Sequence, residues 1–274
     1  MVLHYAEGGN LHNLVNKYYN DFDWSYNIRA LLSIIEGLKE IHQKQMVHCD
    51  FHTGNILSLY DIFDMSDSMN ISDMGLCGEV DNIDKTKIYG VMPYLAPEVL
   101  NGKPYTQAAD IYSFGMIMYF VAAGKQPFAN CAHDEFLVLN ICNGIRPEIN
   151  ELEVPKCYTD LMRKCWDPNP DNRPTATESF EFIYLFLCSY NYSKEEFKSY
   201  MRIKKEQQHY EIKKQFDEAE EYRRSHLSSF DGRQLITHPQ AIYKSRLLND
   251  FTKDLSKYND NIDNNTVEIF DFTK

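Results

Sequence analysis

An amphipathic helix that runs directly into a polar loop constrains the fold of this chain more than any other feature. From Asp23 to about Gln45, apolar residues recur at helical spacing, which predicts a helix with one apolar face. These apolar residues are Ile28, Leu31, Leu32, Ile35, Leu38 and Ile41. The loop that follows reads His48-Cys49-Asp50-Phe51-His52-Thr53-Gly54-Asn55. The pattern therefore predicts an acid, Asp50, and an amide, Asn55, in a loop at the end of a helix.

The chain beyond this loop contains further regular patterns. Residues 55–59 and 69–72 look like two short strands of a hairpin with a polar loop between them. Residues 110–123 predict a helix that is apolar almost all round, which implies burial. Thr175 is expected to cap a helix that runs to about Cys188.

Composition excludes several classes of protein. With 274 residues, 43 % of them hydrophobic, the chain is long enough for one packed domain with an appendage. Its net charge of −12 argues against nucleic acid as the main partner. The seven cysteines form no C-x-x-C pair, so zinc and a disulfide framework are disfavoured and a cytoplasmic (or nuclear) location is favoured. The longest apolar segment, residues 116–123, is far shorter than the ~20 residues of a membrane span, and no signal peptide opens the chain.

The composition shifts near residue 190. Residues 191–225 are rich in Lys, Glu and Gln, which predicts a polar helical extension with charge pairs along its surface. Residues 226–274 hold Asn, Asp, Ser and Lys without a period, which predicts a disordered tail.

An ordered series of motifs spans residues 1–190. The polar loop at residues 48–55 is followed by Asp73-Met74-Gly75, Ala96-Pro97-Glu98, Asp110-Ile111-Tyr112-Ser113-Phe114-Gly115, Cys165-Trp166 and Arg173-Pro174. In this order and spacing the series resembles the hinge and C-terminal lobe of a eukaryotic-type protein kinase, nearest the tyrosine-kinase-like branch. The resemblance implies an α+β protein-kinase-like fold: a mostly helical C-lobe with short β-hairpins, lacking the β-sheet of the N-lobe.

The resemblance also implies the chemistry of the loop. Phosphoryl transfer from ATP to a protein hydroxyl needs a carboxylate that orients and accepts the hydroxyl proton, a role that falls to Asp50. Asn55 and Asp73 would hold Mg²⁺ on the phosphates, and His52 would lie near the transferred phosphate. The nucleotide contacts implied are Leu57 below the adenine, Leu3 at the gatekeeper position, and the backbones of His4 and Ala6 at the hinge.

Two structural contacts follow from the same resemblance. Glu98 is expected to pair with Arg173, and Asp110 is expected to hydrogen-bond the backbone at His48 and Cys49. Both contacts would fix the lobe around the catalytic loop.

The sequence departs from the family pattern at several positions. Cys49 replaces the Arg before the catalytic Asp, which suggests control that does not depend on an activation-loop phosphate. His52 replaces the Lys usual in serine/threonine kinases, and Val91 replaces a Thr, so Ser/Thr is favoured as acceptor while Tyr stays open. No Gly-rich loop and no ATP-positioning Lys precede the hinge, which predicts very little activity for this polypeptide and favours a fragment of a complete kinase.

A second interpretation stays open beside the kinase. The chain could be a catalytically inactive, kinase-like interaction module that binds partners through its hinge edge and helical extension. The substrate and the oligomeric state do not follow from the sequence.

Overall fold

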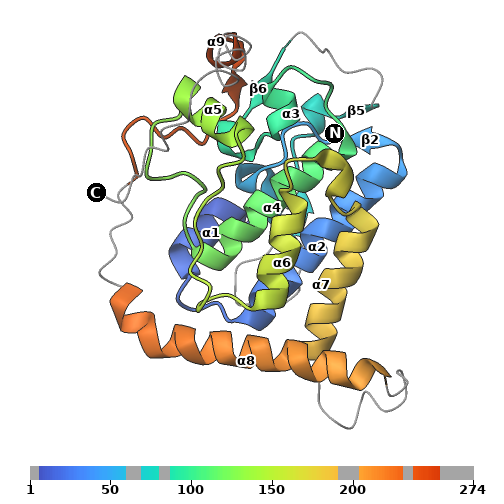
Figure 1. Cartoon of the computed structure of the whole chain (residues 1–274), viewed down its shortest axis with the longest axis vertical. Helices are drawn as coiled ribbons and strands as arrows, with labels where there is room; N and C mark the ends of the chain where they lie inside the picture. Colours follow the sequence, from blue (N-terminus) through green and yellow to red (C-terminus); the bar gives the residue numbers. More distant parts are fainter. Residues whose placement is uncertain (1–5, 60–68, 80–86, 191–203, 231–236, 254–274) are drawn as a thin grey trace, which may run out of the picture.

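A buried helix, α4, lies at the centre of the molecule in a computed structural model that describes residues 6–59, 69–79, 87–190, 204–230 and 237–253 (Figure 1). This helix, Gln107–Ala123, is buried at almost every position, as its all-round apolar pattern predicts. Helices α2 and α6 pack against it, and the predicted apolar face of α2 is buried at Ile28, Leu31, Ile35 and Leu38. The helices in the described residues are α1 (Leu11–Tyr18), α2 (Trp24–Gln43), α3 (Pro97–Leu100), α4, α5 (Glu135–Cys142), α6 (Lys156–Cys165), α7 (Ala176–Tyr190), α8 (Lys204–Phe230) and α9 (Asn249–Thr252).

The strands are short and all pair antiparallel. β3 (Ile56–Ser58) lies between β1 (Gly9–Asn10) and β4 (Met69–Ile71), and the β3–β4 pairing confirms the predicted hairpin. β2 (Met46–Val47) pairs with β5 (Gly78–Glu79) on the two sides of the polar loop. β6 (Tyr89–Gly90) pairs with β7 (Arg246–Leu247). In this pairing Gly90 lies opposite Arg246, which is 156 residues further along the chain. The few short strands and the helical majority agree with the expected fold class.

The polar helix predicted within 191–225 is observed as α8, Lys204–Phe230, and it is better anchored than its composition suggests. It lies across one end of the molecule in Figure 1. Phe216 of α8 is fully buried and meets the rings of Trp24 and Phe186 at centroid distances of 5.5 and 5.8 Å. The expected charge pairs lie on its outer face, for example Lys213–Asp217 at 3.1 Å. One apolar side therefore fastens a helix that is otherwise solvated.

Residues 237–253 correct the expectation of a disordered tail over 226–274. The structure describes them as an ordered segment that contains β7 and α9 and lies beside β6 and α5, at the opposite end of the molecule from α8 (Figure 1). Leu248 of this segment is completely buried. Composition failed here because the segment's order comes from contacts with the lobe and not from its own periodicity.

Candidate active site

The carboxylate of Asp110, in α4, holds the polar loop in place. Its Oδ2 accepts a hydrogen bond from the backbone N–H of His48 at 2.8 Å and lies 3.0 Å from Nε2 of His42. Its Oδ1 accepts from the backbone N–H of Cys49 at 3.3 Å. These bonds confirm the contact predicted at His48 and Cys49, and they help to hold Cys49 in the left-handed region at φ 69°, which non-glycine residues rarely adopt.

A second buried contact joins α3 to the turn before α7. Nη1 and Nη2 of Arg173 donate to the two carboxylate oxygens of Glu98 at 2.7 and 2.8 Å, which confirms the predicted pair. Nη1 of Arg173 also donates to the carbonyl of Ala108 at 2.9 Å. The geometry is bidentate and the arginine head is shielded from water, so the pair is a strong, directional link.

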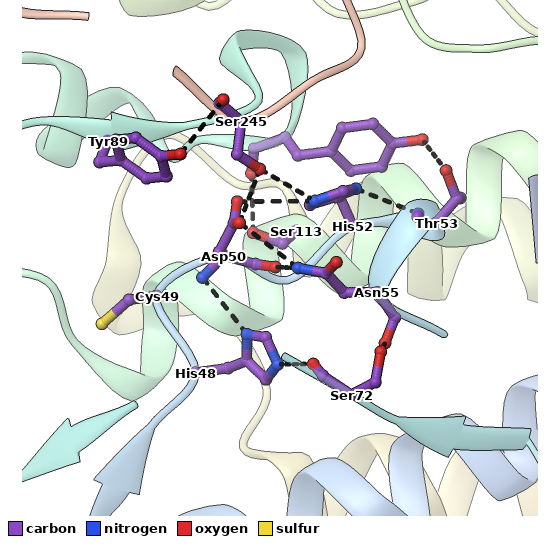
Figure 2. Close-up of polar contacts among 12 residues, drawn as sticks. His48, Cys49, Asp50, His52, Thr53, Asn55, Ser72, Tyr89, Ser113 and Ser245 are labelled. Atoms are coloured by element: carbon purple, nitrogen blue, oxygen red, sulfur yellow. Dashed lines mark hydrogen bonds and ion pairs between the residues drawn. The ribbon is translucent and has the colours of Figure 1, made fainter. Parts of the chain in front are cut away.

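Asp50 lies at the centre of the loop with its carboxylate almost fully buried (Figure 2). Its Oδ2 accepts hydrogen bonds from the hydroxyl of Ser245 at 2.6 Å and from the amide of Asn55 at 3.3 Å. Its Oδ1 is buried without a hydrogen-bond partner in the described structure. Burial raises the pKa of Asp50, but the nearby ring of His52, the hydroxyl of Ser245 and the charge of His48 lower it by more, so the net pKa lies below the ordinary value of 3.8. The carboxylate is therefore ionised at neutral pH.

Two histidines flank this acid, and their hydrogen bonds assign their tautomers. Nδ1 of His52 accepts from the backbone N–H of Gly54 at 3.0 Å, so a neutral ring carries its proton on Nε2. That Nε2 lies 3.6 Å from Oδ1 of Asp50. Nδ1 of His48 accepts from the N–H of Asp50 at 3.3 Å, and its Nε2 faces the carbonyl of Ser72 at 3.0 Å. His52 thus faces the carboxylate, whereas His48 ties the loop to the residue before Asp73.

Asn55 and Asp73 provide oxygen atoms suited to a hard cation. The amide nitrogen of Asn55 donates to the carbonyl of Asp50 at 2.9 Å, which directs its amide oxygen elsewhere. Ser72 donates to the carbonyl of Asn55 through its N–H at 2.8 Å and its hydroxyl at 2.9 Å, and this brings the following residue, Asp73, close to Asn55. Asp73 is exposed and has left-handed backbone at φ 57°.

An amide oxygen and an exposed carboxylate are the ligand types that Mg²⁺ prefers, so this pair fits the ion. In the described part of the chain, no three His, Cys, Asp or Glu side chains gather as a ready-made metal cluster. Magnesium at this place would therefore take its other ligands from water and phosphate.

The residues expected at the nucleotide base are only partly within the described chain. Leu3 and His4 lie outside the described residues. Ala6 is half-buried, and its carbonyl accepts from the N–H of Gly9 at 3.1 Å. Leu57 is half-buried in β3, where it pairs with Asn10 of β1. Their contact with a nucleotide stays a prediction.

Cys49 occupies the position before Asp50 as an unreactive thiol. Burial raises its pKa, and the negative charges of Asp110 and Asp50 together with nearby Cys77 raise it further. The side chain is thus neutral at physiological pH and gives no positive charge that could bind a phosphate.

Ser245 contacts the catalytic acid, and sequence patterns missed it. Its hydroxyl lies between Oδ2 of Asp50 and Nε2 of His52, at 2.6 and 3.2 Å, and its carbonyl accepts from the hydroxyl of Tyr89 at 3.3 Å (Figure 2). It precedes β7, a strand of two residues, which is too short for an alternating pattern to signal.

The comparisons with known proteins agree with the motif series. A family model described as the protein kinase domain matches residues 1–185. The chain is 33 % identical over 204 residues to human receptor-interacting serine/threonine-protein kinase 1, a match that covers 68 % of this chain and 30 % of that protein. It is 26 % identical over 184 residues to serine/threonine-protein kinase STY17 of Arabidopsis thaliana, covering 67 % and 31 %. It is 30 % identical over 151 residues to a dog dual serine/threonine and tyrosine protein kinase, covering 54 % and 15 %. The chain thus spans less than a third of the length of these curated relatives.

Proposed function

The chain belongs to the protein kinase domain family, and on that basis we propose that it transfers the γ-phosphoryl group of ATP to a protein hydroxyl. The observation that supports this most is the ionised, buried carboxylate of Asp50, one oxygen of which accepts a hydrogen bond from a hydroxyl group at 2.6 Å. A general base must lie within hydrogen-bond reach, about 2.6–3.2 Å between heavy atoms, of the hydroxyl whose proton it takes.

Each loop residue has a part in the proposed reaction. Asp50 orients the acceptor hydroxyl and takes its proton as the oxygen bonds to the γ-phosphorus and the bond to the β,γ-bridging oxygen breaks. The amide of Asn55 donates to Oδ2 of Asp50 and helps to fix its rotamer. The Nε2 proton of His52 points toward the same space and can donate to a transferred phosphate oxygen.

Magnesium would be held by the amide oxygen of Asn55 and the carboxylate of Asp73, where it would neutralise charge on the phosphates. The adenine would lie against Leu57, with Leu3 and the backbones of His4 and Ala6 at its edge.

The acceptor that we propose is Ser or Thr on a protein, because several relatives are named as serine/threonine-protein kinases. A cytoplasmic location fits the free cysteines. In the described chain, no helix is both long and apolar enough to cross a bilayer.

The test is magnesium-dependent ATP binding, measured as a shift in unfolding temperature of the 274-residue chain. At ATP concentrations ~100 times the dissociation constant the folded state gains ~2.7 kcal/mol. For a domain of this size that amounts to a rise of several degrees, at ~2–4 °C per kcal/mol. Asp73→Asn should lose most of the magnesium-dependent part. An equal shift with and without magnesium would contradict the metal site, and no shift at all would favour the non-catalytic interaction module.

A further inference from the structure

The ordered C-terminal segment, residues 237–253, is fastened to the lobe through both backbone and side chains. The backbone N–H of His238 donates to the carbonyl of Ala129 at 2.8 Å, and the N–H of His133 donates to the carbonyl of Gln240 at 3.1 Å. The hydroxyl of Tyr243 donates to the carbonyl of Pro127 at 2.9 Å.

The second half of the segment is held by contacts of the same kind. The guanidinium of Arg246 donates to the carbonyl of His133 at 2.7 Å. The N–H of Leu248 donates to the carbonyl of Ile88 at 2.7 Å, and the N–H of Ile88 donates to the side-chain oxygen of Asn249 at 3.0 Å. Because the contacts extend along the whole segment, it is docked on the lobe as a bound peptide would be.

This docking places one hydroxyl on the catalytic acid. β7 starts directly after Ser245 and pairs with β6, so the strand register sets how far Ser245 reaches across the loop. The side chain of Ser245 then points at Asp50 and His52 (Figure 2). Asp50 is the residue assigned to the acceptor hydroxyl, and His52 is assigned to the transferred phosphate.

We propose that residues 237–253 are an intramolecular substrate of this kinase and that Ser245 is its phosphoacceptor. The inference rests on the proposed function. In the step, Oγ of Ser245 bonds to the γ-phosphorus of ATP, the bond from that phosphorus to the β,γ-bridging oxygen breaks, and ADP leaves. The hydroxyl proton passes along the existing hydrogen bond to Oδ2 of Asp50, which lies 2.6 Å from Oγ.

The nature of residue 245 distinguishes a substrate from a blocking peptide. A blocking peptide needs only the strand pairing, whereas this one presents a nucleophilic oxygen to the acid. Transfer would also end the docking, because phosphoserine has no hydroxyl proton to donate and its negative charge would lie against Asp50. The segment therefore stays docked beside Asp50 until Ser245 is phosphorylated, and it leaves afterwards.

The direct experiment incubates the full 274-residue chain with Mg·ATP and maps phosphate by peptide mass spectrometry, with dephosphorylated casein added as an external acceptor. Phosphate is expected on Ser245 at a low rate, in keeping with the little activity that the sequence predicts for this polypeptide. The initial rate per chain should stay constant over an about hundredfold range of chain concentration, because the acceptor is intramolecular. Ser245→Ala should remove this phosphate.

Thr252→Ala is the matched control. Its hydroxyl lies in the same segment but donates to the carbonyl of Asn249, so phosphate on Ser245 should be unchanged. Phosphate on casein with none on Ser245 would overturn the inference and leave the proposed function standing. Phosphate on neither acceptor would contradict the proposed function and the acceptor role with it.

Docking is measured separately by amide hydrogen exchange without nucleotide. The amides of Ile88 and His133 belong to the lobe but donate to Asn249 and Gln240 of the segment. Leu248→Asp places a charge at a fully buried position and should speed exchange at both amides at least about tenfold.

Leu247→Asp changes the neighbouring side chain, which is 52 % exposed, and should leave exchange at Ile88 and His133 as it is. Fast exchange at both amides in the unaltered chain would overturn the docked arrangement, whatever the result with ATP.

Discussion

Asp110 of α4 and Asp50 of the loop after β2 are both buried aspartates, yet their hydrogen bonding differs. Both oxygens of Asp110 are satisfied, by the backbone of His48 and Cys49 and by the ring of His42. Asp50 has one oxygen shared by two donors and one buried oxygen without a hydrogen-bond partner.

The difference separates a structural carboxylate from a reactive one. Because both carboxylate oxygens of Asp110 are hydrogen-bonded, this residue fixes the loop, and removing it would leave buried N–H groups unpaired. The oxygen of Asp50 that has no hydrogen-bond partner leaves a base that can still gain a proton, although burying an unpaired oxygen costs desolvation free energy. Substitutions of structural carboxylates should therefore lower the unfolding free energy, and substitution of the reactive carboxylate should lower the rate of phosphate transfer.

The largest stability effect should come from Glu98→Gln. It removes one charge of the buried bidentate pair and leaves Arg173 uncompensated, so unfolding free energy should fall by ~3–5 kcal/mol. Urea denaturation measures the change. Glu151→Gln is the control, because its partner Arg163 and Glu151 itself are both exposed, and there the loss should stay below ~1 kcal/mol. Equal losses of unfolding free energy in the two variants would contradict the structural role assigned to the buried carboxylate.

A smaller effect is expected at the start of α7, away from both aspartates. Thr175 and Glu178 form a reciprocal cap, with the N–H of Thr175 donating to Glu178 at 2.8 Å and the N–H of Glu178 donating to the Thr175 hydroxyl at 3.2 Å. Thr175→Ala should lower the unfolding free energy by ~1 kcal/mol, while Thr175→Ser should restore most of it. A loss of unfolding free energy as large as that caused by replacing Asp110 would show that α7 itself holds the loop.

The smallest expected effect is a pH dependence from Asp50. Its pKa is lower in the folded chain than its ordinary value, so ionisation stabilises the fold above about pH 4, and this gain is lost as the pH falls through the folded pKa. Burial works against the lowering, which keeps the net gain small. Urea denaturation between about pH 7 and pH 3 should show a difference between the natural chain and Asp50→Asn that shrinks toward acid. A difference that grows toward acid would mean that the pKa is raised.

Sequence patterns predicted two of the buried contacts that lie within the lobe. Periodicity located α2 and α4, and the ordered motifs predicted the pairing of Glu98 with Arg173 and of Asp110 with the loop backbone. Both kinds of signal depend on residue types that recur at fixed spacing. The pattern could not supply His42 as a partner of Asp110, because a lone histidine at the end of a helix has no distinctive spacing.

The C-terminal part could not be predicted for a different physical reason. Residues 237–253 are polar and have no period, so composition indicated disorder. Their order comes from backbone bonds to β6 and to the turn around His133, and from the burial of one side chain, Leu248. Such long-range pairing leaves no local signal, and for that reason Ser245 was absent from the residues predicted for the site.

The most direct test compares Asp50→Asn with Asp110→Asn in two measurements on the full chain, the initial rate of phosphate transfer and the unfolding free energy. Asp50→Asn should reduce the rate by about 10²–10⁴-fold and change stability by less than ~1 kcal/mol. Asp110→Asn should reduce stability by ~2–4 kcal/mol, because its NH2 group replaces one of the two oxygens and faces one of the buried N–H groups of His48 and Cys49 with a donor. The opposite outcome, a stability loss at Asp50 as large as that at Asp110 with transfer retained, would contradict the assignment of Asp50 as the reactive acid.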